Sequence, residues 1–222
     1  LHSCLSPCGG LSMSPLRIAR EAKARGLQLI ALTDHNSARN IPSFARCCKD
    51  ANITALFGLE ITSAEEAHLL CLFSEPEAAE AMGALAEERL PDFPNNPDLF
   101  GDQVYVDSRE MILGEVEKAL ISATDLSVEQ VVEETHLRGG IVIPCHLDRP
   151  SFSLVMQLGF LPQLPFTAVE CTRIPCTIDT GAYPVITSSD AHEPEQIGSR
   201  SHIVEAESCS WEGLIAAFQR VV

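Results

Sequence analysis

The sequence predicts a single α/β domain in which helices and strands alternate around a parallel sheet. Segments with helix caps and glycine stops alternate with short apolar runs along the whole chain. The 222 residues are 45% hydrophobic and 21% charged, which is the composition of a globular protein with a large core. Neither a composition shift nor a repeat divides the chain, so we expect one domain over residues 1–222.

The first helix is predicted over 14–25. Ser14 can cap it, Pro15 suits its first turn, and Gly26 ends it. The apolar run 27–33 that follows is too short for a helix and too apolar for an exposed segment, so it predicts a buried strand. The same order continues with a helix over 42–49, a strand over 54–59 and another apolar run over 69–73.

One long irregular segment is predicted at 90–102, between an acidic helix over 75–89 and a helix over 108–121. The segment holds three prolines, two asparagines and a glycine, which regular elements do not tolerate. A capping box at 127–130 begins another helix, and the glycines at 139–140 end it. The remaining predictions are strands over 141–145, 167–171, 185–187 and 202–205 and a helix over 211–221.

The chain is strongly acidic, with 15 Lys and Arg against 31 Asp and Glu and a net charge of −16. This charge repels a phosphate backbone, so we do not expect nucleic acid as a partner. No apolar run approaches the roughly 20 residues needed to cross a bilayer, and we expect a soluble, cytoplasmic protein. The nine cysteines are scattered and odd in number, which favours reduced thiols over a disulfide framework.

Side chains of the kind that bind metals follow the predicted strands at their C-terminal ends. In a parallel α/β barrel these ends share one face, where such folds place their active sites. His2, in the loop before the first helix, and His68, at a strand start, would be further members of the group. The residues at the strand ends are His35, Glu60, His146, Asp190 and His192.

Five of the seven histidines therefore belong to this group. Imidazole together with carboxylate selects zinc, manganese or iron, and this many groups at one rim predict two or three divalent metal ions. Bound cations would also offset the repulsion among clustered carboxylates. His136, on a predicted helix, and His202 are expected to be structural or exposed to solvent.

Five short motifs resemble those of the PHP family, which is named for polymerase and histidinol phosphatase. They occur in the family's order between residues 2 and 192, so the resemblance covers nearly the whole chain. The motifs are His2-Ser-Cys-Leu-Ser, Thr33-Asp-His-Asn, Gly58-Leu-Glu-Ile-Thr, Cys145-His-Leu-Asp-Arg-Pro and Ser188-Ser-Asp-Ala-His.

The resemblance implies a distorted (β/α)7 barrel of the TIM type, carrying two or three divalent metals that hydrolyse phosphate esters. It also implies a distribution of ligands among the metals. His2, Glu60 and Asp190 match ligands of the first metal, His35 and His192 those of the second, and His68 and His146 those of the third, with Glu60 bridging the first and third.

Two positions depart from the family pattern. The first histidine of the family's His-x-His motif would precede Leu1. Many members place a His or Asp ligand of the second metal where this chain has Cys8. A Cys8 thiolate could bind zinc, and it could equally be an ordinary loop cysteine beside Gly9 and Gly10.

Three further residues have candidate roles in catalysis. Arg149 could grip the substrate phosphate or merely form a salt bridge at the turn before Pro150, and Arg200 is a weaker second candidate. Asp34 could orient a ligand imidazole, or it could cap the helix that follows. Glu170 also ends a strand on the same rim, but no motif supports a role for it.

Three functions fit these features. The first is a phosphoesterase that releases inorganic phosphate from a phosphorylated metabolite or nucleotide, with the loop at 90–102 setting the substrate. The second is a metal-dependent exonuclease, against which the acidic charge argues. The third is a non-catalytic domain whose metals stabilise the fold or hold a partner, because fold alone does not decide function.

Overall fold

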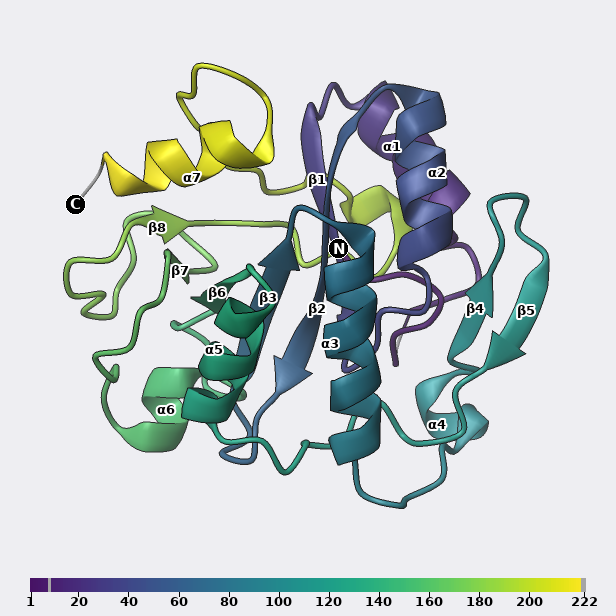
Figure 1. Ribbon diagram of the computed structural model, residues 1–222, viewed down its shortest axis with the longest axis horizontal. Coiled ribbons are helices and arrows are strands. Elements are labelled where there is room, and N and C mark those ends of the chain that lie inside the picture. The colour runs from purple at the N-terminus through teal and green to yellow at the C-terminus, as the bar shows by residue number, and fades with distance from the viewer. Residues whose placement is uncertain (8, 221–222) are drawn as a thin grey trace.

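The computed structural model describes residues 1–7 and 9–220, and its central element is a four-stranded sheet of order β1-β2-β3-β6 (Figure 1). The strands β1 and β2 are parallel, while β3 runs antiparallel to both β2 and β6. The four strands are β1 (Leu29–His35), β2 (Thr54–Thr62), β3 (His68–Phe73) and β6 (Ile141–Pro144).

Two smaller sheets lie beside the central one. The strands β4 (Val104–Val106) and β5 (Ile112–Glu115) form an antiparallel hairpin, and β7 (Val169–Glu170) pairs in parallel with β8 (Val185–Ile186). Backbone hydrogen bonds from Thr167 to Val142 (3.0 Å) and from Leu147 to Glu170 (2.8 Å) join β7 to the edge strand β6. The described strands thus form three sheets and not one closed ring.

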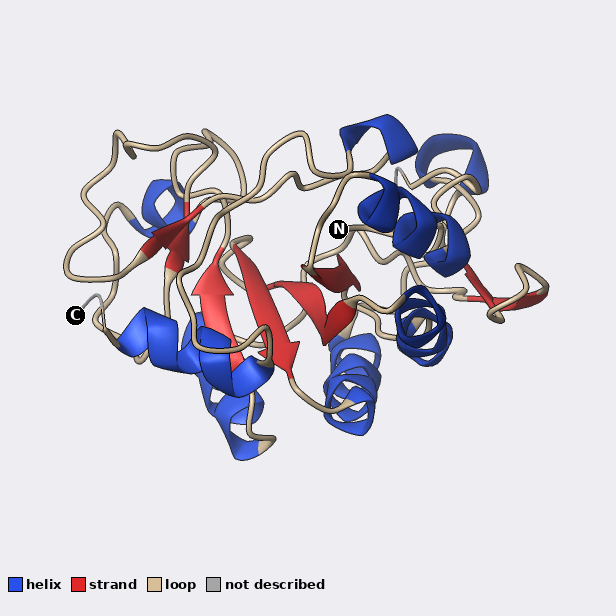
Figure 2. Ribbon diagram, turned by 90° about the horizontal axis from the view of Figure 1, so that it is seen from above, coloured by secondary structure: helices blue, strands red, loops and turns tan. Residues whose placement is uncertain are grey.

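Most of the longer helices cover one side of the central strands, long loops occupy much of the other side (Figure 2), and the C-terminal helix packs on that other side. The longer helices α2, α3 and α5 contact β2, β3 and β6, and α1 packs on α2. The helices are α1 (Pro15–Ala24), α2 (Ile41–Ala51), α3 (Pro76–Arg89), α4 (Pro97–Phe100), α5 (Val128–Leu137), α6 (Leu154–Leu158) and α7 (Trp211–Gln219), with a 3-10 turn at Pro194–Gln196.

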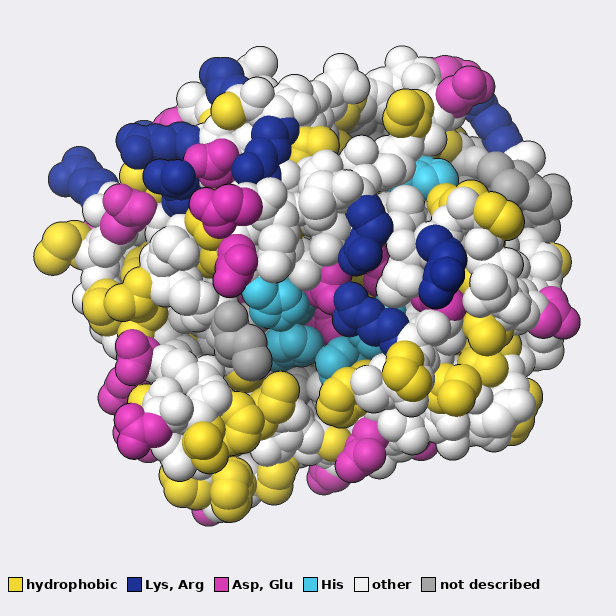
Figure 3. Space-filling model, turned by 180° about the vertical axis from the view of Figure 1, so that it is seen from behind, with side chains coloured by type: hydrophobic (Ala, Val, Ile, Leu, Met, Phe, Trp, Pro, Cys, Tyr) yellow, Lys and Arg dark blue, Asp and Glu magenta, His cyan; other side chains and the backbone are white. Residues whose placement is uncertain are grey.

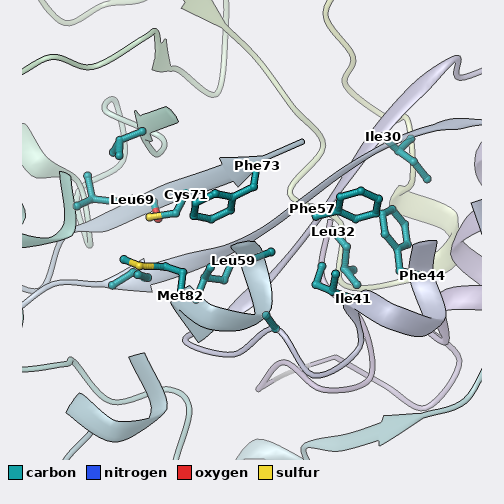
Figure 4. Packing of buried hydrophobic residues seen from close by; sticks show 14 of the residues in the cluster. Ile30, Leu32, Ile41, Phe44, Phe57, Leu59, Leu69, Cys71, Phe73 and Met82 are labelled. Carbon is teal, nitrogen blue, oxygen red and sulfur yellow. The ribbon is translucent and has the colours of Figure 1, made fainter. Parts of the chain in front are cut away.

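The main hydrophobic core lies between the sheet and these helices, because strand side chains alternate between the two faces. Leu59, Leu69 and Cys71 lie near Met82 of α3, and Phe44 of α2 lies farther along the same cluster (Figure 4). All five side chains are fully buried. Burial of aliphatic and aromatic side chains of this size stabilises the fold by about 1.5–3 kcal/mol each.

A second, smaller core lies on the opposite face of the sheet. It contains Leu56 from β2, Leu72 from β3 and Ile143 from β6, and Phe218 of α7 packs against it. Glu60 follows Leu56 by four residues in β2. Its side chain lies on the same face of the sheet as that of Leu56, because every second residue of a strand shares a face. This face therefore runs from an apolar region near α7 to the polar end of the strands.

Most predicted elements are confirmed, but three parts of the prediction are wrong. The sheet is mixed and not purely parallel, because the short connection from β2 to β3 forms a hairpin. The predicted helix over 108–121 is a turn followed by β5, held by the Asp107 side chain, which accepts hydrogen bonds from the backbone of Arg109 and Met111. The predicted strand over 202–205 has no ladder partner, and Ile203 is 91% exposed.

The irregular segment at 90–102 is confirmed apart from the single helical turn α4 within it. The side chain of Ser127 caps α5 and Gln130 completes the capping box, as predicted. No described helix is both long and apolar enough to cross a membrane.

Candidate metal centre

Seven side chains predicted as metal ligands come together at one end of the sheet. Figure 3 shows histidine and acidic side chains gathered in a hollow of the surface, with basic side chains at its edge. Cys8, the eighth predicted ligand, lies outside the described residues. The seven that meet are His2, His35, Glu60, His68, His146, Asp190 and His192.

Strand register explains how β1, β2 and β3 contribute to the cluster. The parallel pairing sets His35 at the end of β1 opposite Glu60 of β2. The antiparallel pairing sets His68, the first residue of β3, opposite Thr62 near the end of β2. A strand start and two strand ends thus reach the same rim because β3 runs in the opposite direction.

His2 is held in the centre of the cluster by backbone and ring contacts. Its backbone N–H donates to the carbonyl of Ala191 at 3.0 Å, and the carbonyl of Leu1 accepts from the N–H of Thr33 at 2.8 Å. The His2 ring stacks on the rings of His35 and His192, with centroid separations of 4.6 and 4.2 Å. The N-terminal residues therefore join β1 to the segment that carries Asp190.

The Glu60 carboxylate is the hub of the cluster. One of its oxygens lies against Nδ1 of His68 and 3.6 Å from Nε2 of His146, and the other lies 3.3 Å from Nε2 of His2. The Glu60 side chain is almost fully buried. A buried carboxylate with three imidazole neighbours has the surroundings that a bridging metal ligand requires.

Asp190 forms the second acidic centre. Its Oδ1 lies 3.1 Å from Nε2 of His2, and its Oδ2 lies 2.7 Å from Nη2 of Arg149. Arg149 therefore forms, from the turn before Pro150, a salt bridge with a carboxylate of the cluster. Arg200 donates to the carbonyls of Ser188 and Ser189 at 2.8 and 3.2 Å, so it holds the segment that precedes Asp190.

A positive charge on His2 organises the electrostatics of the site. Burial alone would lower the pKa of His2, but its hydrogen bonds to Asp190 and Glu60 outweigh burial and raise the pKa to about 9. Burial, together with the charge on His2, lowers the pKa of His192 to about 4 and that of His35 well below its ordinary value. One cationic imidazole thus lies between two carboxylates while its neighbours stay neutral.

The two carboxylates of the cluster stay ionised for the same reason. Burial would raise the pKa of Glu60, but His68 and the hydrogen bonds of His146 and His2 hold it well below its usual range. Burial would likewise raise the pKa of Asp190, and His2 is the main group that lowers it. Ionised carboxylates and the neutral rings of His35 and His192 are in the protonation states that metal ligation requires, whereas His2 would have to release a proton to bind a metal.

The residues present fit a centre for more than one metal ion. The ligand atoms fall into four groups, within each of which all atoms lie within 4.8 Å of one another. The Nδ1 atoms of His35, His68 and His146 are buried without a hydrogen-bond partner among the described residues, although Nδ1 of His68 lies close to Glu60. Unpartnered imidazole nitrogens beside carboxylates are donors suited to zinc, manganese or iron.

Asp34 supports His2 through two serines. Its carboxylate accepts hydrogen bonds from Ser3 N and Ser3 Oγ at 2.6 Å each and from Ser6 Oγ at 2.7 Å. Ser6 Oγ in turn lies 3.1 Å from Nδ1 of His2 and accepts from the N–H of His35 at 3.1 Å. Asp34 thus contacts His2 only indirectly, through Ser6, and its role in orienting an imidazole stays a prediction. No sequence pattern indicated Ser3 or Ser6.

Glu170 is a buried carboxylate. The sequence places it at a strand end, but no motif assigns it a role. Its Oε2 accepts from the backbone N–H of His146 at 3.2 Å, and its Oε1 contacts the hydroxyl of Ser188. Burial raises the pKa of Glu170. Its position at the end of β7 was the available signal, because strand ends supply most of the cluster.

The cysteines depart in one respect from the expected set of reduced thiols, because Cys171 forms a disulfide with Cys176. The other cysteines of the described residues are free, and Cys209 is exposed while the rest are buried. His136 and His202 are both exposed, as predicted. They contribute nothing to the cluster.

The mixed sheet and the histidine–carboxylate cluster define an α/β protein with a candidate multi-metal centre. The chain belongs to the PHP family, because the family model of the PHP domain matches residues 1–136. No curated protein matches the chain.

Solved structures of two kinds share the fold. The lesion-specific endonuclease Q of Pyrococcus furiosus has a TM-score of 0.73 and 16% identity, covering 100% of this chain and 55% of that chain. Endonuclease Q bound to a 27-mer duplex with an abasic lesion gives a TM-score of 0.67, 16% identity and the same 100% and 55% coverage. A proposed metal-dependent phosphoesterase from Bifidobacterium adolescentis gives a TM-score of 0.62 and 17% identity, covering 100% of this chain and 94% of that chain. The chain spans about half the length of the endonuclease chains.

Proposed function

We propose that this protein is a metal-dependent phosphoesterase that hydrolyses a phosphate monoester of a small metabolite or nucleotide. The observation that supports the proposal most directly is the geometry around Glu60 and Asp190. Five imidazoles and an arginine surround these two carboxylates in a hollow of the surface. The products would be inorganic phosphate and the alcohol of the substrate.

The proposal assigns every clustered ligand to a metal. His2, Glu60 and Asp190 would hold one ion, His35 and His192 a second, and His68 and His146, with Glu60, a third. When bound, such ions stabilise negative charge on phosphoryl oxygens and activate water at neutral pH. The proposal therefore requires no nucleophilic side chain.

Arg149 would bind the phosphate group of the substrate. Its guanidinium already faces the cluster through Asp190, at 2.7 Å, and its side chain is 36% exposed, so an entering oxyanion can reach it. Arginine suits this role because its planar fork donates two hydrogen bonds to one phosphate. Asp34 would keep His2 oriented through Ser6 and would not touch the substrate.

A nuclease is the second candidate. The acidic composition led us to expect no nucleic acid, but the endonuclease Q structures share the fold, so that expectation is not supported. A net charge of −16 still has to be overcome locally, and bound cations together with Arg149 would do so at the hollow. The two candidates differ in substrate and share the proposed metal centre.

The proposal extends the PHP domain over residues 1–222 as one domain with a distorted (β/α)7 barrel. Hydrogen bonds that join β6 to β7, and the N-terminal residues to β1 and to Ala191, support this arrangement. A cytoplasmic location stays a prediction. The loop at 90–102 stays the candidate for substrate selection.

The decisive experiment measures metal content and phosphate release together. The purified protein is supplied with Mn²⁺ or Zn²⁺ and assayed on an aryl phosphate, a panel of phosphorylated metabolites and a DNA duplex with an abasic site. Asp190→Ala is the test variant and Asp50→Ala, on the exposed surface of α2, is the matched control. Hydrolysis of monoesters that is lost in Asp190→Ala alone supports the phosphoesterase.

Two other outcomes of this experiment would favour a different function. Cleavage of the DNA without monoester hydrolysis would favour the nuclease. A protein that binds two or more metals and hydrolyses none of the substrates would favour a non-catalytic metal-binding domain.

A further inference from the structure

Cys145 is the buried cysteine that stands apart from the apolar clusters of the described residues. Cys4, Cys47, Cys48, Cys71 and Cys171 all belong to hydrophobic clusters. Cys145 is fully buried but belongs to none of the clusters found in residues 1–7 and 9–220. Its surroundings therefore need an explanation other than apolar packing.

Strand register places the Cys145 side chain on the face that carries the metal centre. The backbone N–H of Cys145 donates to the carbonyl of His68 at 3.0 Å, which extends the β3–β6 ladder by one step. Residues opposite each other in an antiparallel ladder point to the same face. Since His68 faces Glu60, Cys145 faces it too.

The backbone at His146 allows two consecutive residues to reach the site. Successive side chains of a strand point to opposite faces, so Cys145 and His146 could not both face Glu60 if β6 continued. His146 has a φ of +31°, in the left-handed region, and β6 ends at Pro144. This turn redirects the imidazole, and non-glycine residues in that region are found preferentially at functional sites.

The resulting group has the composition of a metal site. Ligand atoms of Glu60, Cys145 and His146 all lie within 4.8 Å of one another, and the three residues are 3%, 0% and 3% exposed. Nδ1 of His146 has no hydrogen-bond partner in the described residues. The only hydrogen bond of the Cys145 thiol there is a weak one to the carbonyl of Ile143, at 4.0 Å.

We propose that Cys145 is a metal ligand, which joins Glu60 and His146 in a sulfur-containing site selective for zinc and similar soft cations over manganese and magnesium. The inference rests on the metal centre of the proposed function and refines the third site. Thiolate donors favour Zn²⁺, whereas Mn²⁺ and Mg²⁺ favour oxygen. On binding, the metal–sulfur bond replaces the S–H bond and the thiol proton passes to solvent.

The test uses cobalt as a spectroscopic probe, because thiolate ligands give Co²⁺ a charge-transfer absorption in the near ultraviolet. All proteins carry Cys8→Ser, so that a second thiolate does not contribute. Cys145→Ser is compared with Cys71→Ser, which removes another fully buried strand thiol, one with the same weak contact to a carbonyl two residues earlier, at 3.9 Å. Cys71 belongs to the helix-side core and is the matched control.

The expected result is a charge-transfer band in the parent and in Cys71→Ser that disappears in Cys145→Ser. Cys145→Ser should also lose about tenfold or more in Cd²⁺ affinity while its Mn²⁺ affinity changes little. A band that persists in Cys145→Ser, or a cobalt-loaded parent without any band, would overturn the proposal.

Two further measurements keep the test conclusive. If Cys145→Ser unfolds, Cys145→Ala replaces it, and X-ray absorption of the zinc-loaded parent counts sulfur neighbours without further substitution. No sulfur neighbour there would contradict the proposal. Phosphate release is measured in parallel, so a hydrolase without the band refutes only the thiolate ligand, and a band without hydrolysis refutes only the phosphoesterase.

Discussion

Glu170 accepts a hydrogen bond from the backbone N–H of His146, with 3.2 Å between Oε2 and the nitrogen. The same carboxylate contacts Ser188, two residues before Asp190. One buried side chain therefore links the two loops that carry His146 and Asp190.

Replacement of Glu170 by alanine should destabilise the protein. The substitution leaves the buried N–H of His146 without its acceptor, and such a loss costs about 1–3 kcal/mol of the free energy of unfolding. Glu170→Gln keeps an acceptor of the same shape and should retain most of the stability. Urea unfolding of both variants measures the difference, and equal stability of Glu170→Ala and the parent would contradict the linking role.

Asp34→Asn should weaken metal binding without touching a metal ligand. The amide keeps one acceptor oxygen where the carboxylate accepts three hydrogen bonds from Ser3 and Ser6. Loss of such support for a ligand typically lowers metal affinity by about 10- to 100-fold. Calorimetric titration with Mn²⁺ or Zn²⁺ gives the affinity, with Asp50→Asn on the exposed surface of α2 as control. Unchanged metal affinity in Asp34→Asn would show that Asp34 does not support metal binding.

Arg149→Ala should reduce kcat/KM for a phosphate monoester by about tenfold or more. A charge-assisted hydrogen bond contributes about 1.5–3 kcal/mol, and about 1.4 kcal/mol corresponds to a factor of ten. Arg149→Lys should recover part of the loss, because it restores the charge but not the planar fork. Arg138→Ala, which removes an arginine paired with Glu134 on α5, is the control. Equal kinetics of Arg149→Ala and this control would show that Arg149 only pairs with Asp190.

Removal of metal should lower thermal stability. A ligand that binds only the folded state at 100 times its Kd adds about 2.7 kcal/mol per site. Differential scanning calorimetry with a chelator and with increasing Zn²⁺ or Mn²⁺ should therefore show a melting temperature that rises with metal concentration. Asp190→Ala should show a smaller rise. A melting temperature that is independent of metal would contradict a centre coupled to folding.

Stability should fall in alkaline solution because of buried thiols. Burial raises the pKa of Cys4, Cys48 and Cys71 from 9 to about 12. Above pH 9 the unfolded chain loses these protons first, so each thiol lowers stability by up to about 1.4 kcal/mol per pH unit until its folded pKa is reached. Below pH 9 the effect is absent.

Urea unfolding between about pH 8 and pH 11 measures this slope. Cys71→Ala should flatten it, whereas replacement of the exposed Cys209 should leave it as it is. A parent protein with constant stability over this range would contradict the assignment.

The parts of the fold that local sequence determines were predictable. Helix α1 follows from Ser14 and Gly26, and α5 from the capping box at Ser127. The hairpin β4–β5 was missed because its formation depends on distant partners. Asn40 accepts from the backbone of Val106 at 2.8 Å, and nothing near Val106 in the sequence signals this contact.

The metal centre likewise combines residues that local sequence predicts with residues that only distant contacts bring in. Strand ends predicted Glu60 and His35, since residues at those positions share a rim. His68 required the family resemblance, because its strand direction is not apparent from the apolar run 69–73. Ser3 and Ser6 could not be found at all, since they reach Asp34 only through the folded backbone.

The backbone hydrogen bond between His2 and Ala191 joins residues that are 189 positions apart in the sequence. During synthesis the N-terminal segment emerges long before the segment that completes its pairing, and contacts of large sequence separation form late in folding. Glu60 and His68 can pair as soon as the β2–β3 hairpin exists, but His2 can pair with Asp190 only after the segment around residue 190 has been made. The metal centre can therefore mature only after that segment has been synthesised.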